Sequence, residues 1–171
     1  TGTDSEDCAP PILRSSPSPS VKEFLMSEPT ETPQSPEPWY KDGLNFTCSQ
    51  CGDCCTGAPG VVWVTDEELQ EIAGHLGKSI EEIRLFHTRL VRGRVSLTEY
   101  QNGDCTFFDA EKRHCKVYPV RPIQCQTWPF WQSNVASEQK WGQVCEDCPG
   151  AGQGTFFSLE QVEERASRMD V

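Results

Sequence analysis

The residues best suited to chemistry in this chain are its cysteines, of which it has 10. Four of them fall in one short segment, with the spacing Cys48-x-x-Cys51-x-x-Cys54-Cys55. A C-x-x-C turn lets two thiolates face one cation, and soft sulfur ligands select zinc, iron–sulfur centres or Cu(I). No packing requirement places four thiols in a polar, glycine-bearing segment, so this spacing favours metal binding.

Further cysteines follow downstream, at Cys105, Cys115, Cys125, Cys145 and Cys148. The adjacent Cys54 and Cys55 cannot readily chelate one tetrahedral ion together, so we expect them to serve two neighbouring centres. Eight thiolates would fill two four-sulfur sites, which leaves one cysteine of this region spare. Cys8 stands apart, far upstream, and is not expected to bind metal.

A disulfide framework is the alternative use of these cysteines. Adjacent cysteines rarely meet the geometry that a disulfide requires, and the cysteines from Cys48 to Cys148 are odd in number. No basic-then-apolar leader opens the sequence, which favours a reducing compartment where stable disulfides are rare. We therefore favour metal over disulfides and expect a cytoplasmic protein.

Charge and hydropathy exclude two classes of partner at this level. The chain has 15 Lys and Arg against 26 Asp and Glu, a formal net charge of -11, which disfavours binding to a phosphate backbone. The longest apolar run is Val61–Val64, far short of the roughly 20 residues that span a bilayer. We expect neither nucleic acid nor a membrane as a partner.

Composition divides the chain near residue 40. Residues 1–40 are rich in proline, serine and acidic residues without helical or strand periodicity, so we expect a disordered tail. Residues 41–171 would then form the cysteine-cluster domain. Met26 opens a plausible translation start, and residues 1–25 are on this hypothesis an over-extended gene prediction.

Two capping boxes predict helices ahead of the downstream cysteines. Thr65 with Glu68 precedes apolar residues at helical spacing, and Ser79 with Glu82 precedes Ile83, Phe86 and Leu90. Further expected elements are a hairpin at Asn102-Gly103, an ordered loop over 118–131, a turn over Gly150–Gly154 and a last helix from Ser158. The fold class predicted is a small, loop-rich α+β domain, with two or three short helices, one hairpin, and metal centres in place of a large hydrophobic core.

Several motifs together resemble one known family. The chain is similar to the CxxCxxCC cysteine-cluster family (YkgJ-like), a domain thought to chelate zinc or iron, in Phe46-Thr-Cys48-x-x-Cys51-Gly52-x-Cys54-Cys55, Cys105-x-Phe107-Phe108-Asp109, Arg121-Pro122-x-x-Cys125 and Cys148-Pro149-Gly150. The resemblance implies a metal domain whose ligands are Cys48, Cys51, Cys54, Cys55, Cys105, Cys115, Cys125 and Cys148, with Cys145 as a further candidate. Gln126 departs from the family pattern, which often has Arg there.

Other side chains are candidates for supporting roles. Arg121 either donates to a metal-bound thiolate or forms a salt bridge that braces its loop. Trp128, Phe130 and Trp131 are expected to shield a metal site from water. His114, next to Cys115, is a minor ligand candidate, because histidine is a common zinc ligand.

Three functions fit these observations. The first is a metal-binding protein that holds iron–sulfur clusters, which scarce histidine and eight cysteines favour slightly, or zinc. The second is an enzyme, either an iron–sulfur-dependent oxidoreductase or a methyl-transfer accessory protein, as the resemblance suggests. The third is a thiol redox or metal-trafficking protein that exchanges its ligands. The sequence does not decide whether a reaction is catalysed.

Overall fold

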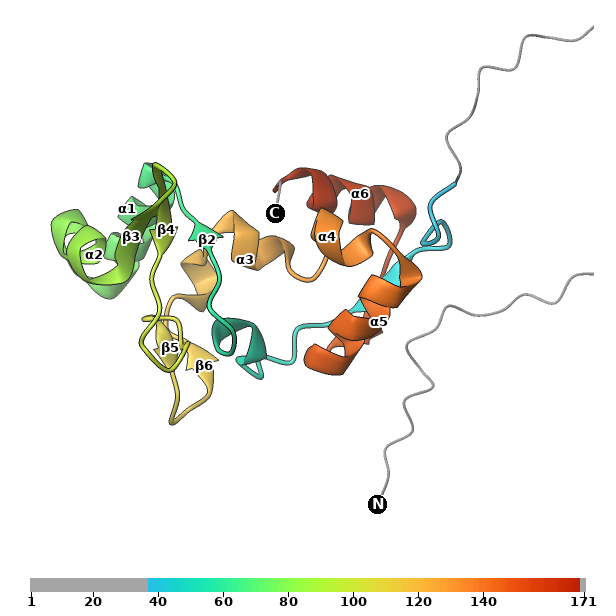
Figure 1. Cartoon of the computed structure of the whole chain (residues 1–171), viewed down its shortest axis with the longest axis horizontal. Coiled ribbons are helices and arrows are strands. Elements are labelled where there is room, and N and C mark those ends of the chain that lie inside the picture. The colour runs from blue at the N-terminus through green and yellow to red at the C-terminus, as the bar shows by residue number, and fades with distance from the viewer. Residues whose placement is uncertain (1–36, 170–171) are drawn as a thin grey trace, which may run out of the picture.

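The computed structural model describes residues 37–169 as a mixed helix and strand fold (Figure 1). The predictions for residues 1–36, including those for Cys8, Met26 and the tail, lie outside the described residues. Trp39 and Tyr40, at the end of the segment predicted as a tail, pack against the second hydrophobic cluster. The Trp39 indole Nε1 donates to the carbonyl oxygen of Val135 at 2.7 Å, which pairs the polar atom of a large apolar ring.

One group of elements gathers two helices and a small sheet. It comprises β2 (Val62–Trp63), α1 (Asp66–Leu76), α2 (Ile80–His87), β3 (Thr88–Val91) and β4 (Arg94–Leu97). The three strands pair antiparallel in the order β2-β4-β3. Both predicted capping boxes are confirmed, because the Thr65 and Ser79 side chains accept from the backbone of Glu68 and Glu82 while those carboxylates bind back.

The second helix is shorter than its apolar period suggested. Leu90 was expected to continue the helical face of Ile83 and Phe86, but α2 ends at His87 and Leu90 lies in β3. Residues 88–91 form the strand β3, which pairs with β4 through a tight turn. The stabilisation from this strand pairing outweighs that from extending the helix.

A second group of elements forms the other end of the molecule. It comprises β1 (Leu44–Phe46), α4 (Gln132–Val135), α5 (Glu138–Asp147), β7 (Ala151–Phe157) and α6 (Leu159–Ser167). The predicted last helix is confirmed, with a capping box between Ser158 and Gln161. The turn expected over Gly150–Gly154 is wrong, since Ala151–Phe157 is a strand that pairs antiparallel with β1. Glycines at positive φ within a strand allow that irregular pairing.

Short elements connect the two groups. They are η2 (Asp53–Cys55), β5 (Phe108–Asp109), β6 (His114–Cys115), η3 (Tyr118–Val120) and α3 (Ile123–Thr127). The loop predicted over 118–131 is therefore wrong in part, because Pro119 and Pro122 stand at helix starts, where proline is tolerated. The Asn102-Gly103 turn is present, but a single bridge between Glu99 and Cys105 takes the place of a longer hairpin.

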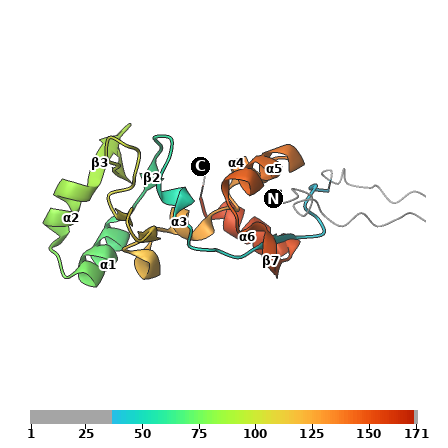
Figure 2. The ribbon, with the colours of Figure 1, turned by 90° about the horizontal axis from the view of Figure 1, so that it is seen from below.

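Two separate hydrophobic clusters form the interior. One contains Leu69, Ile72, Ile83 and Phe107, and the other contains Phe130, Trp141, Val144 and Val162. Figures 1 and 2 show α3 and the segment between β1 and β2 running between the two groups of elements. No helix within residues 37–169 is long and apolar enough to cross a membrane.

Candidate metal site

A cavity of about 780 Å³ lies where residues of the two clusters meet. Its wall contains Phe46 and Cys148 from one side and Phe107 and Val117 from the other. The wall also contains all eight predicted ligands, Cys48, Cys51, Cys54, Cys55, Cys105, Cys115, Cys125 and Cys148. All eight are free thiols. Cys145, on α5, is not part of this wall.

The cysteine loop, which we define as residues 47–56, connects the two groups of elements. Its start is held to the second group, where the Thr47 backbone N–H donates to the Gly150 carbonyl oxygen at 3.1 Å. Its end is held near the first group, where the Cys105 N–H donates to the Cys55 carbonyl oxygen at 2.8 Å. The loop therefore presents its four thiols between the two hydrophobic clusters.

The turn within this loop depends on a glycine. Gly52 has a φ of 81°, and a Cβ built on it would lie 2.4 Å from the Phe108 ring. Arg113 fixes the same turn, since its Nε donates to the Cys51 carbonyl oxygen at 3.2 Å and its guanidinium pairs with Asp53. The residue after Cys51 is thus glycine, because the Phe108 ring occupies the space of a side chain.

Cys115 enters the site from β6, and Cys105 enters it from the bridged segment that leads into β5. Cys115 lies on β6 and pairs with Phe108 of β5, just after Cys105. Because side chains alternate along a strand, His114 is directed away from the side of Cys115, and it does not line the cavity. The minor prediction of His114 as a ligand therefore finds no support in its placement.

Cys125 is positioned by α3, which is fixed at two points. The side chain of Gln124, only 1% exposed, accepts from the Trp63 N–H at 2.8 Å and donates to the Val61 carbonyl oxygen at 2.8 Å. The Glu68 carboxylate accepts from the Ile123 N–H at 2.7 Å. These two side chains hold α3 against β2 and α1, and sequence reasoning did not assign either role. The polar character of Gln124 within an apolar, proline-rich stretch was the available signal.

Cys148 is the least exposed residue of the eight and belongs to the second cluster. It follows α5, where its N–H donates to the Val144 carbonyl oxygen at 2.8 Å, and its own carbonyl oxygen accepts from Ala151 at 2.9 Å. Those bonds fix the backbone on both sides of the cysteine. The thiol is therefore held at a set depth while the cysteine loop remains more exposed.

Contacts among the thiols change their acidity. Hydrogen bonding from the Cys55 thiol lowers the pKa of the Cys54 and Cys115 thiols to about 7, and the positive charge of Arg121 acts in the same direction. The same hydrogen bonds raise the pKa of Cys55. The thiolate is the form that binds metal, and these shifts favour that form at Cys54 and Cys115 near neutral pH.

Burial acts in the opposite direction elsewhere in the site. It raises the pKa of Cys105 to about 11 and also raises the pKa of Cys125. A buried thiol resists ionisation without a nearby cation. A bound metal ion would supply that positive charge and favour the thiolates of Cys105 and Cys125. These two thiols are therefore suited to metal binding as well.

Arg121 lies in the cavity wall beside Tyr118. Its guanidinium stacks over the Tyr118 ring at 4.0 Å and donates to the Tyr118 carbonyl oxygen at 2.7 Å. Among residues 37–169 it forms no ion pair, so the salt-bridge interpretation finds no support in this part of the chain. Hydrogen bonding between the Tyr118 hydroxyl and the Cys48 thiol raises the pKa of Tyr118.

The aromatic residues predicted to shield the site divide into two sets. Trp128 and Trp131 line the cavity, with ring centroids 4.8 Å apart in an edge-to-face arrangement. Phe130 is buried in the second cluster behind them. The eight thiols, however, are not already gathered around a metal position, because no group of three or more Cys, His, Asp or Glu side chains among residues 37–169 has that arrangement.

Comparison with known proteins agrees with the motif. Residues 47–149 match the CxxCxxCC family, described as "Putative zinc- or iron-chelating domain". The chain belongs to this family. The matched range begins just before Cys48 and ends just after Cys148, so it spans all eight cysteines of the cavity wall. The family description supports metal binding by this domain.

A curated relative gives no further function. The chain is 34% identical over 91 residues to the uncharacterized protein MJ0661 of Methanocaldococcus jannaschii, a match that covers 53% of this chain. The chain spans 48% of the length of that relative. No solved structure matches the chain.

Proposed function

We propose that this protein binds iron–sulfur clusters through the thiols of Cys48, Cys51, Cys54, Cys55, Cys105, Cys115, Cys125 and Cys148. The observation that carries the proposal is the shared cavity, whose wall contains these eight free thiols and excludes Cys145. Thiolates alone suit iron–sulfur centres as well as zinc. Family membership supports the coarser statement that the domain chelates zinc or iron.

The size of the cavity favours a cluster over a single zinc ion. A tetrahedral zinc site has Zn–S distances of about 2.3 Å, so its four sulfur atoms lie only about 3.8 Å apart around the ion. The eight thiols instead line a space of about 780 Å³, and no group of three or more Cys, His, Asp or Glu among residues 37–169 is arranged to hold one metal ion. An inorganic cluster of several metal and sulfide atoms would fill more of that space and reach more distant thiols.

The surroundings of the thiols suit a charged, water-sensitive centre. Trp128 and Trp131 form an apolar part of the wall, and exclusion of water tunes the potential of a cluster. Arg121 brings a positive charge close to Cys54 and Cys115, which offsets part of the charge of bound thiolates. We expect Arg121 to act on the centre in this way rather than as a ligand.

Metal analysis of the full chain, purified without oxygen, tests the proposal. We expect iron together with acid-labile sulfide, a brown protein, and broad charge-transfer absorption in the visible range. Stoichiometric zinc in a colourless protein would replace the iron–sulfur proposal with zinc chelation by the same thiols. A protein that retains neither metal, with thiols that react freely, would overturn metal binding itself.

A further inference from the structure

The edge of the small sheet in the first group carries exposed apolar side chains. Leu90, on β3, exposes 76% of its surface, and Phe86, on the preceding helix α2, exposes 63%. β3 pairs with β4 along one side, and no strand pairs with its other side in the part of the chain that the structure describes. Another chain can add a strand to such an open edge and cover the exposed apolar side chains beside it.

The register shows which backbone groups the edge offers. The Thr98 N–H donates to the His87 carbonyl oxygen at 3.0 Å, so this row is a hydrogen-bonded pair. Rows alternate along an antiparallel ladder, which makes Arg89 the next residue bonded to β4. The backbone N–H and carbonyl groups of Thr88 and Leu90 therefore point toward the open side.

Phe86 and Leu90 both lie at the margin of the first hydrophobic cluster, and we call these two residues the apolar lip. Leu90 pairs with Val95, so both side chains lie on one face of the sheet, and Val95 packs against the first cluster. Phe86 follows the fully buried Ile83 by three residues on α2, which places it on the same side of the helix. The lip is thus the uncovered margin of a hydrophobic cluster.

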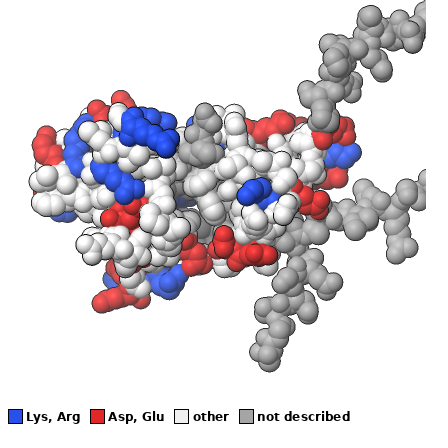
Figure 3. All heavy atoms as spheres, viewed as in Figure 1, with Lys and Arg blue, Asp and Glu red and all other residues white. Residues whose placement is uncertain are grey.

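Basic residues surround this margin in an otherwise acidic protein. Residues 78–94 contain five Lys or Arg and two Glu, but Arg84 pairs with Asp66 and Arg89 with Glu99, so the net charge with these two partners is +1. The whole chain has a net charge of -11. Figure 3 shows basic side chains gathered over the end of the molecule that carries α2, β3 and β4. An acidic segment is therefore the chemistry that this surface attracts.

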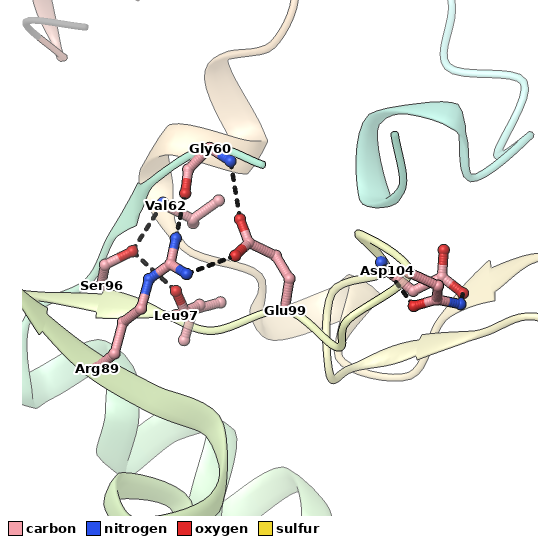
Figure 4. Close-up of polar contacts among 8 residues, drawn as sticks. Gly60, Val62, Arg89, Ser96, Leu97, Glu99 and Asp104 are labelled. Atoms are coloured by element: carbon pink, nitrogen blue, oxygen red, sulfur yellow. Dashed lines mark hydrogen bonds and ion pairs between the residues drawn. The ribbon is translucent and has the colours of Figure 1, made fainter. Parts of the chain in front are cut away.

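The face of the sheet opposite the lip carries the arginine of β3. Arg89 pairs with Glu99 at 2.7 Å and donates to the Gly60 carbonyl oxygen, as Figure 4 shows. The adjoining turn, Arg92-Gly93, adds an exposed arginine at its first position. Two copies of this edge would bring these like charges together, which disfavours pairing of the chain with itself.

We propose that β3 is a docking edge for an extended acidic segment of a partner protein, in which apolar and acidic residues alternate. Its backbone would bind the free groups of Thr88 and Leu90. Its apolar side chains would cover the apolar lip, and its acidic side chains would lie on the other face near Arg92. The proposal does not depend on which metal the cysteines bind.

A short synthetic peptide that alternates Glu and Val tests this edge, with the metal-loaded full chain as the binding protein. We expect the labelled peptide to bind, to bind less tightly as salt rises, and to slow amide hydrogen exchange in the segment that contains Thr88 and Leu90. A peptide with Lys in place of Glu should bind at least about tenfold more weakly. Equal binding of the two peptides, or no binding of the acidic one, would overturn the proposal.

Two single variants separate the lip from general charge effects. Leu90→Glu should weaken binding by about tenfold or more, because it removes half of the lip and repels the acidic peptide. Leu85→Glu, at a side chain that exposes 73% on the opposite side of α2 from Ile83, adds the same charge and should change binding by less than about threefold. Equal losses in the two variants would mean that charge alone attracts the peptide and that β3 is not the docking edge.

Discussion

The backbone N–H of Cys105 donates to the carbonyl oxygen of Cys55 at 2.8 Å. Both residues line the cavity, and they come from segments that lie 50 residues apart in the sequence. The bond joins the end of the cysteine loop to the strand region of the first cluster. Two cysteines of one site are therefore positioned by backbone structure before any ligand chemistry contributes.

Loss of Cys125 tests whether the cavity thiols act as metal ligands. Cys125→Ser should lose roughly half of the bound metal if the eight thiols form two four-sulfur centres, because serine is a poor ligand for soft metals. Metal content per chain and thermal unfolding of the same preparation are the measurements. Cys145→Ser is the control, since Cys145 does not line the cavity, and its metal content should stay unchanged. Equal metal content in Cys125→Ser and the unaltered protein would remove Cys125 from the ligand set.

Gly103 tests how closely its turn must approach Gly57, the residue that follows the cysteine loop. A Cβ on Gly103 would lie 2.1 Å from the Gly57 carbonyl oxygen, and its φ is +87°. Gly103→Ala should therefore reduce the free energy of unfolding by about 2 kcal/mol more than Gly93→Ala. Gly93 has a similar φ of +79° but open space around it, so alanine there should cost only about 1 kcal/mol. Urea unfolding of both variants provides the comparison, and equal losses would show that no close approach exists at Gly103.

The elements that sequence predicted well are those whose determinants are local. The side chains of Thr65 and Ser79 each accept a hydrogen bond from a backbone N–H in the first turn of the helix that follows. A capping box can therefore be recognised without tertiary information. The eight cysteines that the motif spacing and the family resemblance single out all line the cavity. The helix ends are less local, as Leu90 illustrates, because pairing with β4 decides its state.

The elements that sequence missed depend on distant partners. β7 contains glycines and carries no strand period, and it becomes a strand only because β1, more than 100 residues away, pairs with it. The helix α3 lies among prolines, and the bonds of Gln124 and Glu68 to other elements position it. Neither interaction has a signal within a short window of sequence.

Glu68 links a helix cap to the segment that carries Cys125. One carboxylate oxygen accepts from the Thr65 N–H at 2.8 Å and the other from the Ile123 N–H at 2.7 Å. Glu68→Gln turns one acceptor into a donor that faces an N–H, which should lower the free energy of unfolding by about 1–2 kcal/mol. It should also hasten removal of the metal by a chelator, because α3 is held less firmly. Glu67→Gln, at an exposed neighbour, is the control, and a chelation rate equal in the two variants would contradict the link to the site.

His87 should make the folded state sensitive to mild acid. Its ring stacks on Phe107 with centroids 4.4 Å apart, and its Nδ1 is shielded from solvent and has no hydrogen-bond partner among residues 37–169. Burial lowers the pKa of His87, and the charges of Lys78 and Lys116 lower it further. The folded state therefore prefers the neutral ring. The stabilisation that the neutral His87 ring gives the folded state is complete above the unfolded-state pKa of about 6.5. It is lost as the pH falls through the lower pKa of the folded state.

His87→Phe keeps the stacking on Phe107 and removes the titration. We expect the free energy of unfolding to fall less in this variant than in the unaltered protein between about pH 7 and pH 5. Both proteins lose stability in acid as their thiolates are protonated, so the difference between the two curves isolates His87. Denaturant unfolding across this range measures that difference, and His75→Gln, at an exposed histidine on α1, should follow the unaltered protein. Parallel curves for His87→Phe and the unaltered protein would show that burial of the His87 ring does not oppose its protonation.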